Sequence, residues 1–145
     1  MQALRGASGV QAGPLARSAA VVEFGFRVAV VDAVVRVTTE GPITLDRGSE
    51  IIKRAAQAAV ENSSRSVLFD IREAAFPHFL TDMIEYARLA PTLGLDRSFR
   101  IAFFGAKGEL DLRFLESVAV NRGFQAKVFT DETQALSWLK SFSNA

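Results

Sequence analysis

The sequence predicts a single α/β domain: one mixed, largely parallel sheet of about five strands flanked by about four helices. The 145 residues suit one domain. Two early segments alternate apolar and polar residues, as half-buried strands do. Short apolar segments then alternate with segments of helical periodicity, which is typical of parallel strands joined by helical crossovers.

The composition excludes several classes of function. The chain has 17 Lys and Arg against 16 Asp and Glu, a net charge of +1, which is too balanced for an electrostatic grip on nucleic acid. It has no cysteine and one histidine, so we expect neither a metal site nor thiol chemistry, and no cofactor. We find no transmembrane run, while transient membrane contact stays open. A cytoplasmic location is expected.

The start of the chain differs from the remainder. Residues 1–20 are rich in Ala, Gly and Ser, and Gly or Pro interrupts every apolar stretch, which argues against a signal peptide. A faint likeness to an organelle transit peptide is the alternative. We expect residues 1–22 to be a disordered tail and residues 23–145 to form the domain.

The first half of the domain is expected to open with a hairpin and continue into a helical crossover. Residues 40–44 form a turn that ends at Thr44, whose hydroxyl can cap the next helix. The strand after that helix is apolar throughout, as in a strand buried on both faces. The expected elements are strands at 24–30 and 34–39, a helix from 45 to about 62, and a strand at 66–71.

The second half repeats the alternation of helix and strand. Pro91 marks the end of its first helix, Gly123 the end of its second, and Asp131 caps the last with Gln134 as capping-box partner. The expected elements are a loop at 72–78, a helix at 80–90, a strand at 100–104, a turn at 105–108, a helix from about 110 to 122, a strand at 125–129 and a helix at 132–142.

Four landmarks carry a family resemblance: the motif GPIT at residues 41–44, the strand ending in Phe69-Asp70, the segment IAFFGA, and the closing VFTDETQALSWL. Together they resemble the SpoIIAA-like family of small bacterial proteins, which is related in fold to STAS domains and more loosely to CRAL-TRIO lipid-transfer domains. The residues of this structural signature are Gly41, Thr44, Asp131, Ala135, Trp138 and Leu139.

The resemblance implies a mixed sheet flanked by helices and a cytoplasmic regulatory or ligand-binding module, with no known reaction. Anti-anti-sigma STAS proteins carry a phosphorylatable serine at the start of the helix after the central strand. Residues 76–81 contain no serine, so a phosphorylation switch of that kind is not expected.

The segment at residues 76–93 carries more apolar bulk than one helix face needs. Such an excess has three explanations, which stay open. It can form an interface with a partner or with a second copy of the chain, it can form a lid over an apolar pocket, or it can serve packing alone. Pro77 and Pro91 bracket the segment and Gly94 supplies an exit, so we expect a movable cover over an apolar cleft. The candidate ligand or interface residues are Asp70, Phe76, His78, Phe79, Leu80, Met83 and Tyr86.

Two functions are therefore weighed. The first is a non-enzymatic module that recognises a protein partner or an apolar, lipid-like small molecule. The alternative is a small hydrolase or transferase that uses His78 with Asp70 or Glu73, although no GxSxG or HExxH motif accompanies them. Asp70 ends a predicted parallel strand, where ligands of α/β proteins bind, but it can equally pair with Arg72. No residue is assigned as catalytic.

Overall fold

A mixed sheet of six strands runs through the part of the chain described by the computed structural model, which comprises residues 21–23, 25–108 and 111–143. The strands are β2 (Val21–Glu23), β3 (Phe26–Val31), β4 (Val34–Pro42), β5 (Ser66–Ala75), β6 (Arg100–Phe104) and β7 (Gln125–Phe129). The helices are α1 (Leu45–Glu61), α2 (Phe79–Leu89), the short 3-10 helix η2 (Ala90–Leu93), α3 (Leu112–Asn121) and α4 (Glu132–Ser143).

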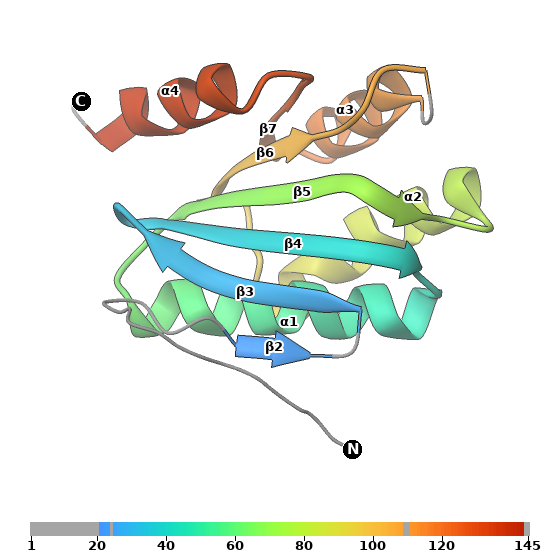
Figure 1. Ribbon diagram of the computed structural model, residues 1–145, viewed down its shortest axis with the longest axis horizontal. Helices are drawn as coiled ribbons and strands as arrows, with labels where there is room; N and C mark the ends of the chain where they lie inside the picture. The colour runs from blue at the N-terminus through green and yellow to red at the C-terminus, as the bar shows by residue number, and fades with distance from the viewer. Residues whose placement is uncertain (1–20, 24, 109–110, 144–145) are drawn as a thin grey trace.

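The strands lie in space in the order in which they occur in the chain (Figure 1). The pairs β2–β3 and β3–β4 are antiparallel, and the pairs from β4 to β7 are parallel. This confirms the predicted fold class. The additional strand is β2, which begins at Val21 and pairs with β3, so Val21 and Val22 belong to the sheet and not to the predicted tail at residues 1–22. Residues 1–20 of that predicted tail lie outside the described residues.

The strand order explains where the helices lie. A crossover between adjacent parallel strands is almost always right-handed, so successive crossovers in one direction place their helices on one face of the sheet. Helices α1, α2 and α3 are these crossovers, and α1 contacts α2 while α2 contacts α3. Helix α4 follows the last strand and packs on the opposite face (Figure 1).

Strand β5 separates two hydrophobic cores. Its residues 66–71 are all buried, as predicted, and successive side chains point to opposite faces. Val67 and Phe69 join the large core beneath α1, α2 and α3, whereas Leu68 joins the small core beneath α4. The three-helix face therefore holds most of the apolar interior, including the region predicted to be a cleft.

Two predicted loop segments are wrong because the strands are longer than their apolar runs. Strand β4 continues to Pro42, into the predicted turn, and β5 continues to Ala75, into the predicted loop. The two extensions pair with each other, Gly41 beside Ala74, after a register shift in β4. The β3–β4 hairpin turns on Asp32 and Ala33, both with positive φ (53° and 64°), as in a type I′ turn.

The predicted helix ends are confirmed where the structure describes them. The Thr44 hydroxyl accepts a hydrogen bond from the Arg47 amide at 3.3 Å, and Asp131 accepts one from the Gln134 amide at 3.1 Å. Helix α2 ends at Leu89, just before Pro91, and Gly123 follows α3 with φ 91°. The expected first residue of that helix, Leu110, lies outside the described residues.

The closing segment of the signature forms the small core. Ala135 and Leu139 of α4 are fully buried against the sheet. Trp138 is only partly buried, and its ring packs on Phe129 with the centroids 5.8 Å apart. No helix of the described residues is long and apolar enough to cross a bilayer.

Candidate functional site: an apolar cavity beneath α2

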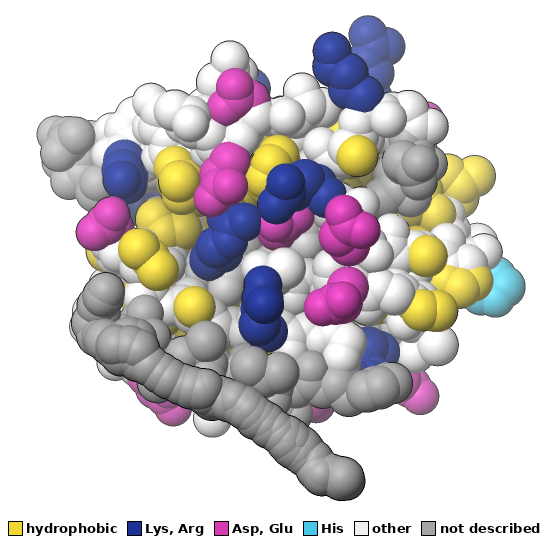
Figure 2. Space-filling model, viewed as in Figure 1, with side chains coloured by type: hydrophobic (Ala, Val, Ile, Leu, Met, Phe, Trp, Pro, Cys, Tyr) yellow, Lys and Arg dark blue, Asp and Glu magenta, His cyan; other side chains and the backbone are white. Residues whose placement is uncertain are grey.

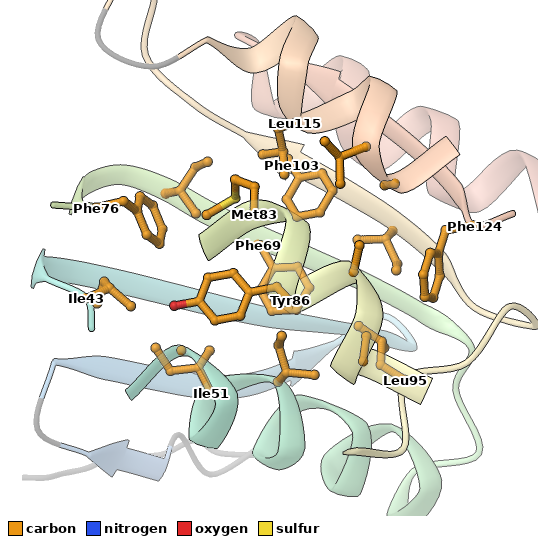
Figure 3. Close-up of a pocket in the computed structure, with 18 of the residues that line it drawn as sticks. Ile43, Ile51, Phe69, Phe76, Met83, Tyr86, Leu95, Phe103, Leu115 and Phe124 are labelled. Carbon is orange, nitrogen blue, oxygen red and sulfur yellow. The ribbon is translucent and has the colours of Figure 1, made fainter. Parts of the chain in front are cut away.

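A cavity of about 100 Å³ lies between the sheet and the three helices of the large core (Figure 3). Helix α2 and the connection that leads into it from β5 supply one wall through Phe76, Met83 and Tyr86, three of the predicted candidates. Met83 and Tyr86 are three residues apart on α2, so they project from the same side of the helix. The predicted apolar cleft beneath residues 76–93 is thus present as a small cavity.

The sheet supplies the floor of this cavity. Phe69 of β5 and Phe103 of β6 are partners in the parallel register, and their rings stack with centroids 5.7 Å apart and planes 16° apart. Ile71 and Ile101 extend the floor on the same two strands. Because β-branched and aromatic side chains are stiff, the floor offers a shape that changes little.

Helix α1 meets α2 at a glycine. A Cβ atom at Gly48 would lie 2.0 Å from the Tyr86 Oη and 2.3 Å from the Tyr86 Cζ, so only glycine leaves room for this ring. The Tyr86 hydroxyl donates a hydrogen bond to the Thr44 carbonyl oxygen at 3.1 Å. Burial, together with the negative charge of Asp82, raises the pKa of the Tyr86 phenol above its usual value.

The remaining aromatic candidate lies outside the cavity. Phe79 packs between Phe76 and Phe114, with ring centroids 6.0 Å and 6.2 Å away. Leu80 is 57% exposed and Ile84 is 46% exposed, so one stripe of α2 presents apolar side chains to solvent. The cavity and this stripe occupy different sides of the same helix.

His78 is the residue before α2, and its exposed side chain makes no capping hydrogen bond. Figure 2 shows the single histidine at the rim of the molecule beside hydrophobic side chains. Among the described residues, no hydrogen bond or ion pair joins His78 to Asp70 or Glu73. The structure therefore does not assemble the predicted catalytic group.

Asp70 lies on the other face of the sheet from the cavity, where Arg36 and Arg72 hold its carboxylate. Its Oδ2 accepts hydrogen bonds from Arg36 at 2.9 Å and from Arg72 at 2.8 Å, and only 4% of the side chain is exposed. Arg36 also bonds to Glu132 of α4 at 2.6 Å. Figure 2 shows charged side chains of both signs gathered on this face.

The ion pairs fix the charge state of Asp70. Burial alone would raise the pKa of the Asp70 carboxyl, but hydrogen bonds from Arg72 and the charges of Arg72 and Arg36 outweigh burial and lower it. An ionised carboxylate bound by two guanidinium groups is a structural link rather than a general base. Of the two roles foreseen for Asp70, the structure shows the pairing with Arg72.

The structure adds wall residues that no local pattern identified. Gly48 and Ile51 of α1 and Leu115 and Ala119 of α3 line the cavity, although each helix alone reads as an ordinary amphipathic helix. Gly48 was the one sequence feature of α1 that indicated a close contact at this wall, because glycine destabilises the interior of a helix. No group of three or more potential metal ligands occurs among the described residues.

Comparison of the sequence with protein-family models gives no match, and comparison with curated proteins gives none. Among solved structures, the chain is similar to an uncharacterised protein of the DUF3478 family from Shewanella loihica PV-4, which has a SpoIIAA-like fold. The TM-score is 0.54 and the sequence identity is 19%, over 90% of this chain and 99% of the other. The architecture described above and this similarity together show that the chain has a SpoIIAA-like fold.

Proposed function

We propose that the protein is a non-enzymatic binding module that holds a small apolar molecule in the cavity beneath α2. The cavity itself carries the proposal, because native cores leave few voids larger than a water molecule. An engineered apolar cavity of about 150 Å³ stays dry and binds benzene, so a cavity of about 100 Å³ suits a small apolar guest. Pockets for drug-sized ligands start at about 300 Å³, so a longer lipid would require α2 to move.

Helix α2 is suited to such movement. It takes no part in the hydrogen bonding of the sheet, and the Tyr86–Thr44 hydrogen bond links it to the residue that precedes α1. Gly94, with φ 106°, ends η2 and gives the chain a turning point after the segment. Displacement of α2 would therefore leave the strand pairing intact.

The test is a titration of the protein with benzene, followed through amide and methyl chemical shifts. We expect saturable shifts at residues around the cavity, such as Met83 and Leu115. Ala119→Leu places a larger side chain in the cavity and should abolish the shifts. Ala58→Leu is the matched control on α1, because Ala58 is partly buried but does not line the cavity. Absence of saturable binding in the native protein would overturn the proposal.

A protein partner is the second candidate function, and the exposed Leu80 and Ile84 favour it. Such a partner, which includes a second copy of the chain, would bind the outer stripe of α2. Leu80→Asp should then abolish an association seen by sedimentation velocity, whereas Val60→Asp, at a 66% exposed position on α1, should not. A monomer at all concentrations, with no partner retained in native mass spectrometry, would contradict this candidate.

A further inference from the structure

We infer that, with α2 in the position described here, the ligand of this cavity is electrically neutral and no larger than about one aromatic ring, and that the Tyr86 side chain sets this size limit. The inference rests on the proposed function and names the class of ligand that the same site would accept. Two independent features of the wall carry it: the polar groups available inside the cavity, and the fit of Tyr86 against Gly48.

The wall offers no donor to a charged ligand. Thr39 and Tyr86 are the lining residues with polar side chains, and no lining residue is charged. Both hydroxyls already donate to carbonyl oxygens, Thr39 to that of Asp70 at 3.1 Å and Tyr86 to that of Thr44 at 3.1 Å. A carboxylate or phosphate inside this cavity would lose its water and find no hydrogen bond, so anions are strongly disfavoured.

The same wall explains the limit on size. The Tyr86 ring lines the cavity and packs against Gly48 of α1, in a space that exists because residue 48 is glycine (Figure 3). The cavity of about 100 Å³ is smaller than the benzene-binding cavity of about 150 Å³. A ligand of one aromatic ring therefore fits after slight relaxation of the wall. A ligand of two fused rings fits only if the Tyr86 side chain moves out of the space beside Gly48.

The closing experiment compares three probes on the native protein: benzene, benzoate and naphthalene. We expect benzene to bind at least about 100-fold more tightly than benzoate, because the anion would be buried without a donor. Naphthalene should bind weakly to the native protein and to Tyr86→Phe, which keeps the ring. It should bind at least about tenfold more tightly to Tyr86→Ala, which vacates the space beside Gly48. Tyr86→Leu is the second variant if Tyr86→Ala does not fold.

The outcomes separate the inference from the proposed function. Benzoate binding equal to that of benzene, and lost in Ala119→Leu, would overturn neutrality while the binding module stands. Naphthalene binding to the native protein as tightly as benzene would overturn the role of Tyr86 and again leave the module intact. Failure of benzene to bind the native protein would overturn both, because the inference rests on the binding module.

Discussion

Tyr86 is the single tyrosine of the chain, so its ionisation can be followed directly. Burial and the charge of Asp82 raise its pKa above the usual 10.0, because both disfavour the phenolate. An unfolded chain ionises near the usual value, so Tyr86 contributes stability below that pH, and this contribution is lost as pH rises above it. We expect the ultraviolet absorbance of tyrosinate to appear only well above pH 10.0 and together with unfolding. Titration at the usual value in a folded protein would contradict this.

Asp70 is expected to stabilise the protein from the opposite face. Asp70→Ala leaves Arg36 and Arg72 without their shared partner, and we expect a loss of about 3 kcal/mol in the free energy of unfolding at neutral pH. Because the folded pKa lies below the usual 3.8, this contribution is present above that pH and is lost as pH falls through the folded pKa. Denaturant melts across pH measure both effects.

Arg72→Ala is the control for Asp70. Its side chain is 45% exposed and Arg36 still pairs with Asp70 in the variant, so we expect a loss of only about 1 kcal/mol. Equal losses in the two variants, or an Asp70→Ala protein as stable as the native one, would show that the carboxylate is not the centre of this group.

The Asp70 pairing illustrates what sequence reasoning can reach at single residues. Arg72 is two positions along the same strand, so both side chains lie on one face of the sheet and their pairing was foreseeable. Arg36 and Glu132 come from β4 and α4, and their approach depends on strand order, which local sequence does not encode. The ion pairs of Arg36 with Asp70 and with Glu132 therefore could not be predicted from the sequence.

At the scale of elements, the seam between α1 and α2 gives a sharp prediction. Gly48→Ala should cost about 1–3 kcal/mol, because the new Cβ atom would overlap the Tyr86 ring. In the Tyr86→Ala background the overlap is gone, and the same change should stabilise α1 by up to about 1 kcal/mol. Thermal or chemical denaturation of the four proteins in this cycle measures the coupling. A loss of equal size in both backgrounds would show that the ring is not the obstacle.

Truncation of a fully buried tryptophan to alanine costs about 3–5 kcal/mol. The Trp138 ring is only partly buried, against Phe129, so we expect about 2 kcal/mol for Trp138→Ala. Leu139→Ala is the comparison on the same helix, since Leu139 is fully buried and should cost more. Tryptophan fluorescence is lost in the first variant, so circular dichroism should follow both. A larger loss for Trp138 than for Leu139 would contradict this ranking.

The elements that the sequence predicts well are those whose pattern is local. Strand β6 has the expected ends, and Thr44 and Asp131 cap the helices as expected. Strand β5 runs past its apolar part because Ala74 and Ala75 pair with Gly41 and Pro42, and this depends on a neighbour 33 positions away. The same holds for the cavity. Its α2 wall could be predicted from the local excess of apolar residues, whereas its α1 and α3 walls depend on how distant helices pack together.

At the scale of the whole molecule, the sheet divides the interior into two cores. Ile51→Val in the large core should cost about 1 kcal/mol, and Leu139→Ala in the small core about 2–5 kcal/mol. No side chain belongs to both cores among the described residues, so the double variant should lose the sum within about 0.5 kcal/mol. Denaturant unfolding of the four proteins tests this. A larger deviation would mean that strain passes through the sheet.

The agreement between strand order and chain order also bears on biosynthesis. Each strand from β3 onward pairs with the strand before it in the chain. No strand has to insert later between two strands that are already paired. A nascent chain can thus extend its sheet in the direction of translation, and each new edge is covered by the next strand to emerge. Helix α4 follows all six strands in the chain, so Leu68 and Phe104 stay uncovered until α4 has been made. A ribosome stalled before residue 132 would display that apolar face to chaperones.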